Sequence, residues 1–240
     1  MDESHLKQRV IFVKMLNLPA YIGICFSITT LFCLLLFFKA SNFNKGVIAV
    51  VITWTILQGA IAFTGFYSNT NVLPPRFLFA ILPAVIAIGT LFITSGGKRF
   101  INTLELKWLT LLHLVRVPVE LVLFWLFLNH TLPKVMTFEG WNLDFISGIL
   151  ALFVYYFGYV TKKLGAGILL ILNLVGLCLL INIVTLAVLS TPFPFQKFGF
   201  EQPNIAVFYF PFIWLPTVVV PLVFFSHLVC IRQIILRIKK

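Results

Sequence analysis

The sequence predicts an all-α membrane protein, a bundle of seven transmembrane helices, and three observations support this fold class. Hydrophobic residues make up 60% of the 240-residue chain and charged residues only 10%, whereas about a quarter of the residues in soluble domains are charged. The chain contains seven apolar runs, each near the roughly twenty residues that a helix needs to cross a bilayer. The links between these runs are short, so we expect one transmembrane domain over residues 1–240 and no second domain.

The apolar runs define the expected helices. They lie at about 19–38, 47–66, 77–95, 107–128, 145–161, 167–189 and 206–229. The last run is irregular, because Pro211, Pro216 and Pro221 recur every five residues and a proline interrupts the backbone hydrogen bonds of a helix. Only the fourth run contains residues of the types Asp, Glu, Lys and Arg.

The distribution of basic residues predicts the orientation of the bundle. One side of the predicted bundle carries Lys39, Lys45, Lys98, Arg99, Lys107, Lys162, Lys163, Arg232, Arg237, Lys239 and Lys240. The other side carries Lys7, Arg9, Lys14, Arg76, Lys134 and Lys197. Cytoplasmic loops are enriched in Lys and Arg, so we expect the N-terminus outside and the C-terminus in the cytoplasm. The same scatter of single basic residues through short loops argues against nucleic acid as a partner.

The fourth run places three ionisable side chains in one sector of a helix. His113, Arg116 and Glu120 fall within roughly 60° at about 100° per residue. Each costs on the order of 2.5–3.5 kcal/mol in hydrocarbon, so such residues face a bundle interior or a wet cavity. Arg116 and Glu120 are four residues apart and can pair directly, as a packing device or as part of a ligand site. Pro118 predicts a kink beside them.

The functional interpretation is a pocket between the second, fourth, sixth and seventh helices. Arg116 would hold an anionic or zwitterionic group, Glu120 would be its counter-ion or proton acceptor, and His113 would respond to pH. Four further polar residues complete the predicted ligand site: Gln58, Asn173, Asn182 and His227. For each amide alone, a hydrogen bond between helices is the simpler role.

The outer loops contain a repeated pattern, Phe-Glu-x-x-Asn, just before two predicted helices. The residues are Phe138, Glu139 and Asn142 in one copy, and Phe200, Glu201 and Asn204 in the other. One interpretation is a paired lid over an outer vestibule, with Phe193, Phe195 and Phe198 beneath it. The alternative is two independent helix caps, since Asn caps helices well and a carboxylate near a helix N-terminus is favoured.

Several classes of site are absent from the sequence. His113 and His227 could ligate a haem, but membrane cytochromes show more intramembrane histidines, so we expect no cofactor. The four cysteines form no CxxC pair, and no histidine pattern typical of a zinc site is present. No lysine lies between Lys197 and Lys239, which excludes a retinal Schiff base in the last helix.

These observations predict an integral membrane protein, in the plasma (inner) membrane, that binds or transports a small polar or amphiphilic molecule. The expected partners are membrane lipids and this ligand, with a membrane-protein partner or a homo-oligomer left open. The main alternatives are a membrane-embedded enzyme that modifies a lipid, with His113 and Glu120 as acid and base, and an accessory subunit of a larger membrane complex.

Overall fold

The computed structural model describes residues 15, 17–70, 72 and 74–239, and all regular elements in this part of the chain are helical. Five helices are long and apolar enough to cross a membrane, or six if the bent pair α4 and α5 counts as one span. This confirms the all-α class and is compatible with an integral membrane protein. The basic residues Lys7, Arg9 and Lys14, and also Lys240, lie outside the described residues.

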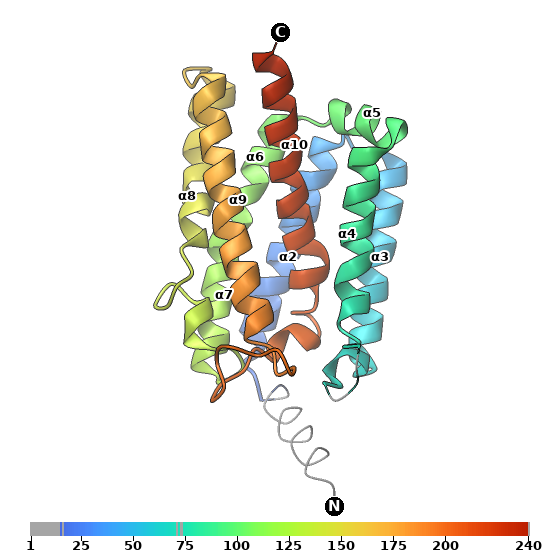
Figure 1. Cartoon of the computed structure of the whole chain (residues 1–240), viewed down its shortest axis with the longest axis vertical. Helices are drawn as coiled ribbons and strands as arrows, with labels where there is room; N and C mark the ends of the chain where they lie inside the picture. Colours follow the sequence, from blue (N-terminus) through green and yellow to red (C-terminus); the bar gives the residue numbers. More distant parts are fainter. Residues whose placement is uncertain (1–14, 16, 71, 73, 240) are drawn as a thin grey trace, which may run out of the picture.

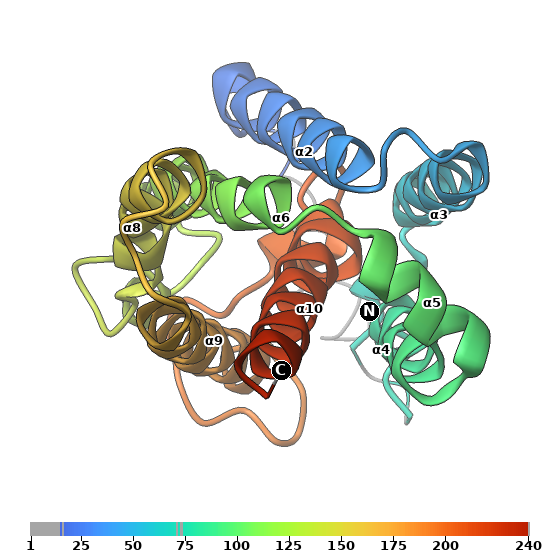
Figure 2. The ribbon, with the colours of Figure 1, turned by 90° about the horizontal axis from the view of Figure 1, so that it is seen from above.

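The first half of the chain forms α2 (Ala20–Ala40), α3 (Lys45–Phe63), the 3₁₀ turn η1 (Phe66–Ser68) and α4 (Leu78–Ile93). A short amphipathic helix, α5 (Ser95–Thr103), follows α4 at an angle of 92°. Thr94 caps it by accepting a hydrogen bond from the N–H of Gly97. The link between the third and fourth predicted helices therefore contains a helix that crosses the end of the bundle (Figure 2).

The second half contains α6 (Leu106–Leu112), η2 (His113–Val115) and α7 (Arg116–Leu128), followed by the turn η3 (Lys134–Met136). Next come α8 (Asp144–Val154) with its π-helical continuation η4 (Tyr155–Val160), and α9 (Ala166–Leu189). The turn η5 (Ala206–Phe208), the π-helical segment η6 (Leu215–Val219) and α10 (Val220–Ile238) complete the chain. Figure 2 shows α10 inside the bundle, between α9 and α4.

The prediction for the last helix is wrong in its position. The helix runs from Leu215 to Ile238 and not over 206–229, because the prolines break the beginning of the predicted run. Residues 206–214 form a 3₁₀ turn and irregular backbone that includes the cis peptide Phe210–Pro211. Pro216 lies in the first turn of the helical region, where a proline is tolerated because its missing N–H would have no partner there. The other six predicted ranges agree with observed helices to within about three residues.

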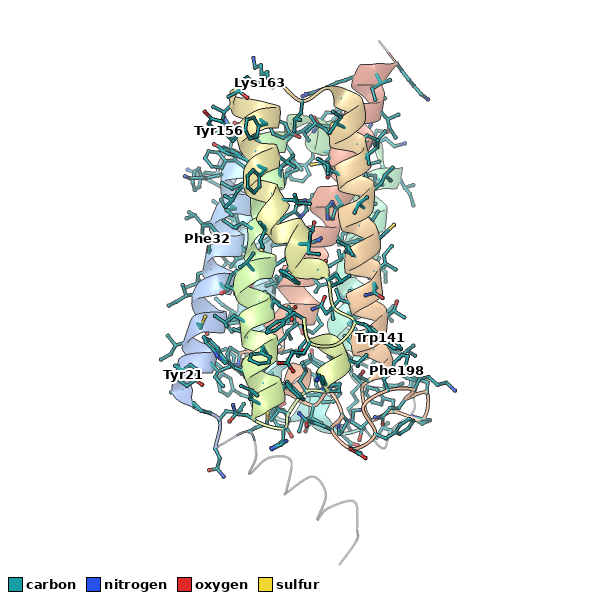
Figure 3. All side chains as sticks on the ribbon, turned by 90° about the vertical axis from the view of Figure 1, so that its left-hand side faces the viewer. Tyr21, Phe32, Trp141, Tyr156, Lys163 and Phe198 are labelled. Atoms are coloured by element: carbon teal, nitrogen blue, oxygen red, sulfur yellow. The ribbon has the colours of Figure 1, made fainter. Side chains whose placement is uncertain are left out.

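The outer surface of the bundle is apolar. On α2, Ile24, Ile28 and Leu31 are each more than half exposed, and Figure 3 shows Phe32 on the same outward side. Tyr156 and Lys163 are near one end of the bundle, while Tyr21, Trp141 and Phe198 are near the other (Figure 3). Aromatic residues at both ends of an apolar belt are typical of membrane-spanning proteins.

Candidate functional site

The fourth predicted span contains an irregular segment at the depth of its charged residues. Its helical hydrogen bonding changes to a 3₁₀ turn at His113–Val115 before α7 begins at Arg116. Pro118, in the first turn of α7, has no N–H to donate to the carbonyl of Leu114. This change of hydrogen bonding lies next to Pro118, and α6, η2 and α7 together still form one span, Leu106–Leu128.

Arg116 is buried, with 3% of its surface exposed, and its partners come from three other helices. Its Nη1 donates to Oδ1 of Asp144 at 2.8 Å and to the carbonyl of Gly176 at 3.1 Å. Its Nη2 lies 2.7 Å from Nε2 of His227. The expected pairing with Glu120 is wrong: among the described residues, the ion pair of Arg116 is with Asp144. The reason is that α8 begins at Asp144, directly opposite the guanidinium.

Glu120 is also buried, but it accepts hydrogen bonds from the loop that precedes α8. The backbone N–H of Phe138 donates to Oε1 at 2.6 Å, and Nδ2 of Asn142 donates to Oε2. Asn142 in turn accepts from the N–H of Asp144 at 3.0 Å. The carboxyl of Glu120 thus satisfies polar groups of the loop, and within the described chain it has no cationic partner.

The hydrogen bonds of His227 determine its tautomer. A guanidinium only donates, so Nε2 of His227 must accept from Arg116 and carries no proton. Nδ1 then donates to Oδ1 of Asn173, 3.2 Å away, while the amide of Asn173 donates to the carbonyl of Leu169. His227 is therefore neutral in this arrangement, because a proton on Nε2 would face Arg116.

His113 stacks on His227 with ring centroids 3.8 Å apart and an interplanar angle of 14°. Both ring nitrogens of His113 are buried without a hydrogen-bond partner among the described residues. This geometry does not favour the haem alternative, since two parallel stacked imidazoles leave no space for an iron atom between their nitrogens. The described residues also contain no group of three or more side chains that could hold a metal ion.

Two glycines let the helices approach one another at this site. A Cβ atom on Gly176 of α9 would lie 2.7 Å from both His227 and the hydroxyl of Ser147. A Cβ atom on Gly148 of α8 would lie 2.9 Å from the side chain of Val117. Both separations are shorter than a carbon atom tolerates, so the close packing around Arg116 depends on the missing side chains.

A pocket of about 120 Å³ lies beside the polar cluster, between α7, α9 and the last helix. Arg116, Glu120, Asn142 and Asp144 form one part of its lining. The rest is mostly apolar: Val115, Val119, Leu123, Leu180, Ile183, Val184, Ala187, Val188, Leu215, Val219, Val220 and Val223, with Phe77 and Ile81 from the start of α4. An apolar chamber with a small number of convergent polar groups is typical of ligand sites.

A smaller pocket of about 60 Å³ lies between α8 and α9, next to the two stacked histidines. His113, His227 and Asn173 line it, together with Thr110 and Ser147. Five of the seven predicted ligand-site residues are therefore divided between two pockets, with Arg116 and Glu120 in the larger of these two.

Gln58 and Asn182 do not line either pocket. Gln58 is buried on α3 and accepts a hydrogen bond from the hydroxyl of Tyr67 at 2.7 Å. Burial raises the pKa of Tyr67, and the bond to Gln58 acts in the opposite direction, so this phenol remains a protonated donor. Asn182 is exposed on α9 and donates to the carbonyl of Trp141 at 3.0 Å.

The two Phe-Glu-x-x-Asn copies do not form a symmetrical lid. Both asparagines, Asn142 and Asn204, are buried and line the larger pocket. The other members are exposed: Phe138, Glu139, Phe200 and Glu201. Glu139 pairs with Lys134 at 3.3 Å, and Phe138 lies against Phe124 with ring centroids 4.7 Å apart. The asparagines thus belong to the pocket, while the phenylalanines and glutamates belong to the surface.

Comparison with known proteins places the chain in a family. A family model with the description "Domain of unknown function (DUF8737)" matches residues 74–235. The chain belongs to this family. The part shared with DUF8737 runs from just before α4 into α10, so it contains Arg116, Glu120, Asp144 and His227 but not α2 or α3. No curated protein and no solved structure matches the chain.

Sequence reasoning missed Asp144 and Gly176. Asp144 lies at the edge of the predicted fifth span, where it resembles an ordinary loop residue. The available signal was the length of that predicted run. At about seventeen residues it is short for a helix that crosses a bilayer, which indicates that the helix begins inside the bundle. No sequence signal identifies Gly176, because its contribution is a backbone carbonyl and the absence of a side chain.

Proposed function

We propose that this chain is an integral membrane protein that binds a small zwitterionic amphiphile in the pocket between α7, α9 and α10. The observation that carries the proposal is the composition of the pocket, which combines apolar walls with one unpaired donor and one buried carboxyl that has hydrogen bonds but no cation beside it. The Nε–H of Arg116 has no hydrogen-bond partner in the described structure, and the carboxyl of Glu120 has no cationic partner. An anionic group at Arg116 and a cationic group at Glu120 would meet both needs.

The formal charges favour a zwitterion over an anion. With neutral histidines, Arg116, Asp144 and an ionised Glu120 sum to one negative charge. A purely anionic head would bring a second negative charge into a medium of low dielectric constant, where like charges repel strongly. A zwitterion adds no net charge and can place its cation beside Glu120. The apolar part of the ligand would then contact Ile183, Val184 and Val219.

We infer that binding serves transport. Helices that are discontinuous near the middle of a membrane are common around the substrate sites of transporters. In this chain the α6–α7 helix changes geometry at His113, α8 begins at Asp144, and η6 precedes α10, and all three irregular segments border the cluster around Arg116.

The proposal includes seven membrane passes, with the bent pair α4 and α5 as the third and the shorter helix Asp144–Val160 as the fifth. It also includes location of the protein in the plasma membrane, with the C-terminus on the cytoplasmic side. Support comes from charge: among the described residues, the end that holds the C-terminus of α10 carries ten basic residues, Lys39, Lys45, Lys98, Arg99, Lys107, Lys162, Lys163, Arg232, Arg237 and Lys239. The opposite end carries Arg76, Lys134 and Lys197.

The test compares ligands that differ only in the head. Thermal unfolding of the purified protein is measured with lysophosphatidylcholine, lysophosphatidic acid and a long-chain amine of matched chain length. A ligand that binds the folded state raises the melting temperature with concentration. We expect the largest rise with the zwitterion. Equal rises with all three heads would contradict the role of Arg116 and Glu120.

Two matched variants locate the effect. Ile183→Phe fills the pocket, whereas Ile181→Phe changes an exposed residue on the same helix, α9. We expect the zwitterion to stabilise the Ile181→Phe variant like the parent protein and to lose its effect on Ile183→Phe. If both variants respond like the parent, the ligand does not occupy this pocket.

A further inference from the structure

A third cavity lies between α3, α4 and α10, separate from the two pockets around Arg116 and the histidines. It has a volume of about 440 Å³. Its walls are apolar and include Val47 and Val51 of α3, Ala84 and Ile88 of α4, and Leu222 of α10. The lining residues of α3 run from Gly46 to Trp54, which corresponds to ~12 Å along a helix. This groove therefore occupies the half of the bundle that holds the C-terminus.

A pair of tryptophan hydrogen bonds joins the helices at the inner end of the groove. Nε1 of Trp54 donates to the carbonyl of Thr217 at 2.9 Å, and Nε1 of Trp214 donates to the carbonyl of Thr55 at 2.9 Å. Pro221, four residues after Thr217, has no N–H and so cannot donate to this carbonyl. Helix α3 and the segment Trp214–Thr217, which precedes α10, are thus held together at Trp54, and the groove lies between Trp54 and the end of the bundle.

Helix α5 covers the outer end of the groove. Phe100 of α5 is part of the groove lining, and α5 crosses the bundle end beside α4 (Figure 2). Two contacts hold α5 against α10: Arg232 donates to Oδ1 of Asn102 at 2.5 Å, and Gln233 donates to the carbonyl of Ile101 at 2.8 Å. The groove therefore has a cover at the end of the bundle that holds the C-terminus.

Basic residues surround this covered end. Lys45 directly precedes Gly46 and Arg99 directly precedes Phe100, so both are next in sequence to residues that line the groove, and Lys98 is one position further from Phe100. All three are exposed, and none has a carboxylate partner among the described residues. No Asp or Glu occurs between Lys45 and Leu104, and the next acid, Glu105, pairs with Lys107 at 2.8 Å.

We propose that this groove binds an anionic phospholipid of the inner leaflet, with an acyl chain along α3, α4 and α10. Lys45, Lys98 and Arg99 hold the anionic headgroup. Apolar walls alone would accept any acyl chain, but three basic residues without acidic neighbours favour a negatively charged head. The site is independent of the zwitterion pocket, because the two cavities share no lining residue.

Native mass spectrometry of the full-length protein tests the proposal, with phosphatidylglycerol and phosphatidylcholine of identical chains as probes. We expect preferential retention of phosphatidylglycerol. The variants Lys45→Gln, Lys98→Gln and Arg99→Gln should each weaken it about 5-fold, the factor that corresponds to about 1 kcal/mol per basic residue. The control pair Lys162→Gln and Lys163→Gln removes charge at the same end of the bundle and should leave retention unchanged.

Two further experiments separate the contribution of the acyl chain from that of the headgroup. Ala84→Trp fills the groove and should abolish retention, whereas Val85→Trp, on the neighbouring exposed position, should not. Inorganic phosphate should not displace the lipid, because it lacks the acyl chain. Equal retention of the two lipids by the parent protein would overturn the proposal. So would a loss of phosphatidylglycerol in Lys162→Gln and Lys163→Gln as large as in the variants of Lys45, Lys98 and Arg99. The Ile183→Phe variant should retain phosphatidylglycerol, whatever its effect on the zwitterion.

Discussion

Arg116 illustrates how a single guanidinium is accommodated in an apolar bundle. Asp144 provides the opposite charge, and the carbonyl of Gly176 and Nε2 of His227 take two further N–H groups. Of the three guanidinium nitrogens, Nε alone has no partner among the described residues. Removing one member of a buried ion pair is costly, because the remaining charge has lost its partner. The stability of the bundle should therefore depend strongly on Asp144.

We expect Asp144→Asn to destabilise the protein by about 3–5 kcal/mol, the usual cost of breaking a buried pair. The matched control is Glu139→Gln, which breaks the exposed pair with Lys134 and should cost less than about 1 kcal/mol. Thermal unfolding in a mild detergent measures both. Equal melting temperatures for the two variants would show that Arg116 does not depend on Asp144.

Among the residues of the site, sequence reasoning could identify Arg116 and Glu120 but not their partners. Helical periodicity places the two on one face, and their i,i+4 spacing permits a direct pair. The choice between that pair and a pair with Asp144 depends on where α8 begins relative to α7. That relation is set by tertiary packing, in which Gly148 lies against α7, and it has no local signature.

Helix α9 shows how an element adapts to the site at one position. Gly176 lies where a Cβ atom would meet His227 and Ser147, whereas Gly167, in the first turn of the same helix, has nothing within 4 Å of a Cβ atom. The same residue type therefore has opposite effects at the two positions. One prevents a clash, and the other only gives the unfolded chain extra freedom.

Accordingly, Gly176→Ala should destabilise the protein by about 1–3 kcal/mol through overpacking. Gly167→Ala should be neutral or should stabilise it by up to about 1 kcal/mol, because alanine is the better helix former. Thermal unfolding of the two variants, with far-UV circular dichroism to compare their helix content, decides the matter. A destabilised Gly167→Ala with an unchanged Gly176→Ala would contradict the packing described for α9.

At the level of elements, the sequence predicts most helices well because long apolar runs are a strong signal. The failure at the last helix has a specific cause. Residues 206–214 are as apolar as a span, so hydropathy includes them, but Pro211 and Pro216 prevent regular helix there. Conversely, Arg232 and Arg237 lie beyond the predicted end, although both belong to α10, since charged side chains at the end of a span can extend to the interface.

For the whole molecule, the asymmetry of charge between the two ends determines the expected topology. The described residues around the C-terminal end of α10 are strongly basic, and the loops at the other end contain Glu139 and Glu201. An impermeant maleimide applied to intact cells should label a Glu201→Cys variant directly. It should label Lys163→Cys only after permeabilisation, with the parent chain measuring the background from its four cysteines. The reverse labelling pattern would show that the bundle has the opposite orientation, with its C-terminus outside.

Because α8 starts inside the bundle, its helix is shorter than the hydrocarbon layer of a bilayer. The helix Asp144–Val160 is seventeen residues long, eleven in α8 and six in η4, or ~25 Å, against a hydrocarbon thickness of about 30 Å. A helix this short alone would create a hydrophobic mismatch. However, Trp141 and Leu143 of the preceding loop are 64% and 48% exposed and continue the apolar surface beyond the helix end. Annular lipids beside α8 should therefore keep their normal thickness.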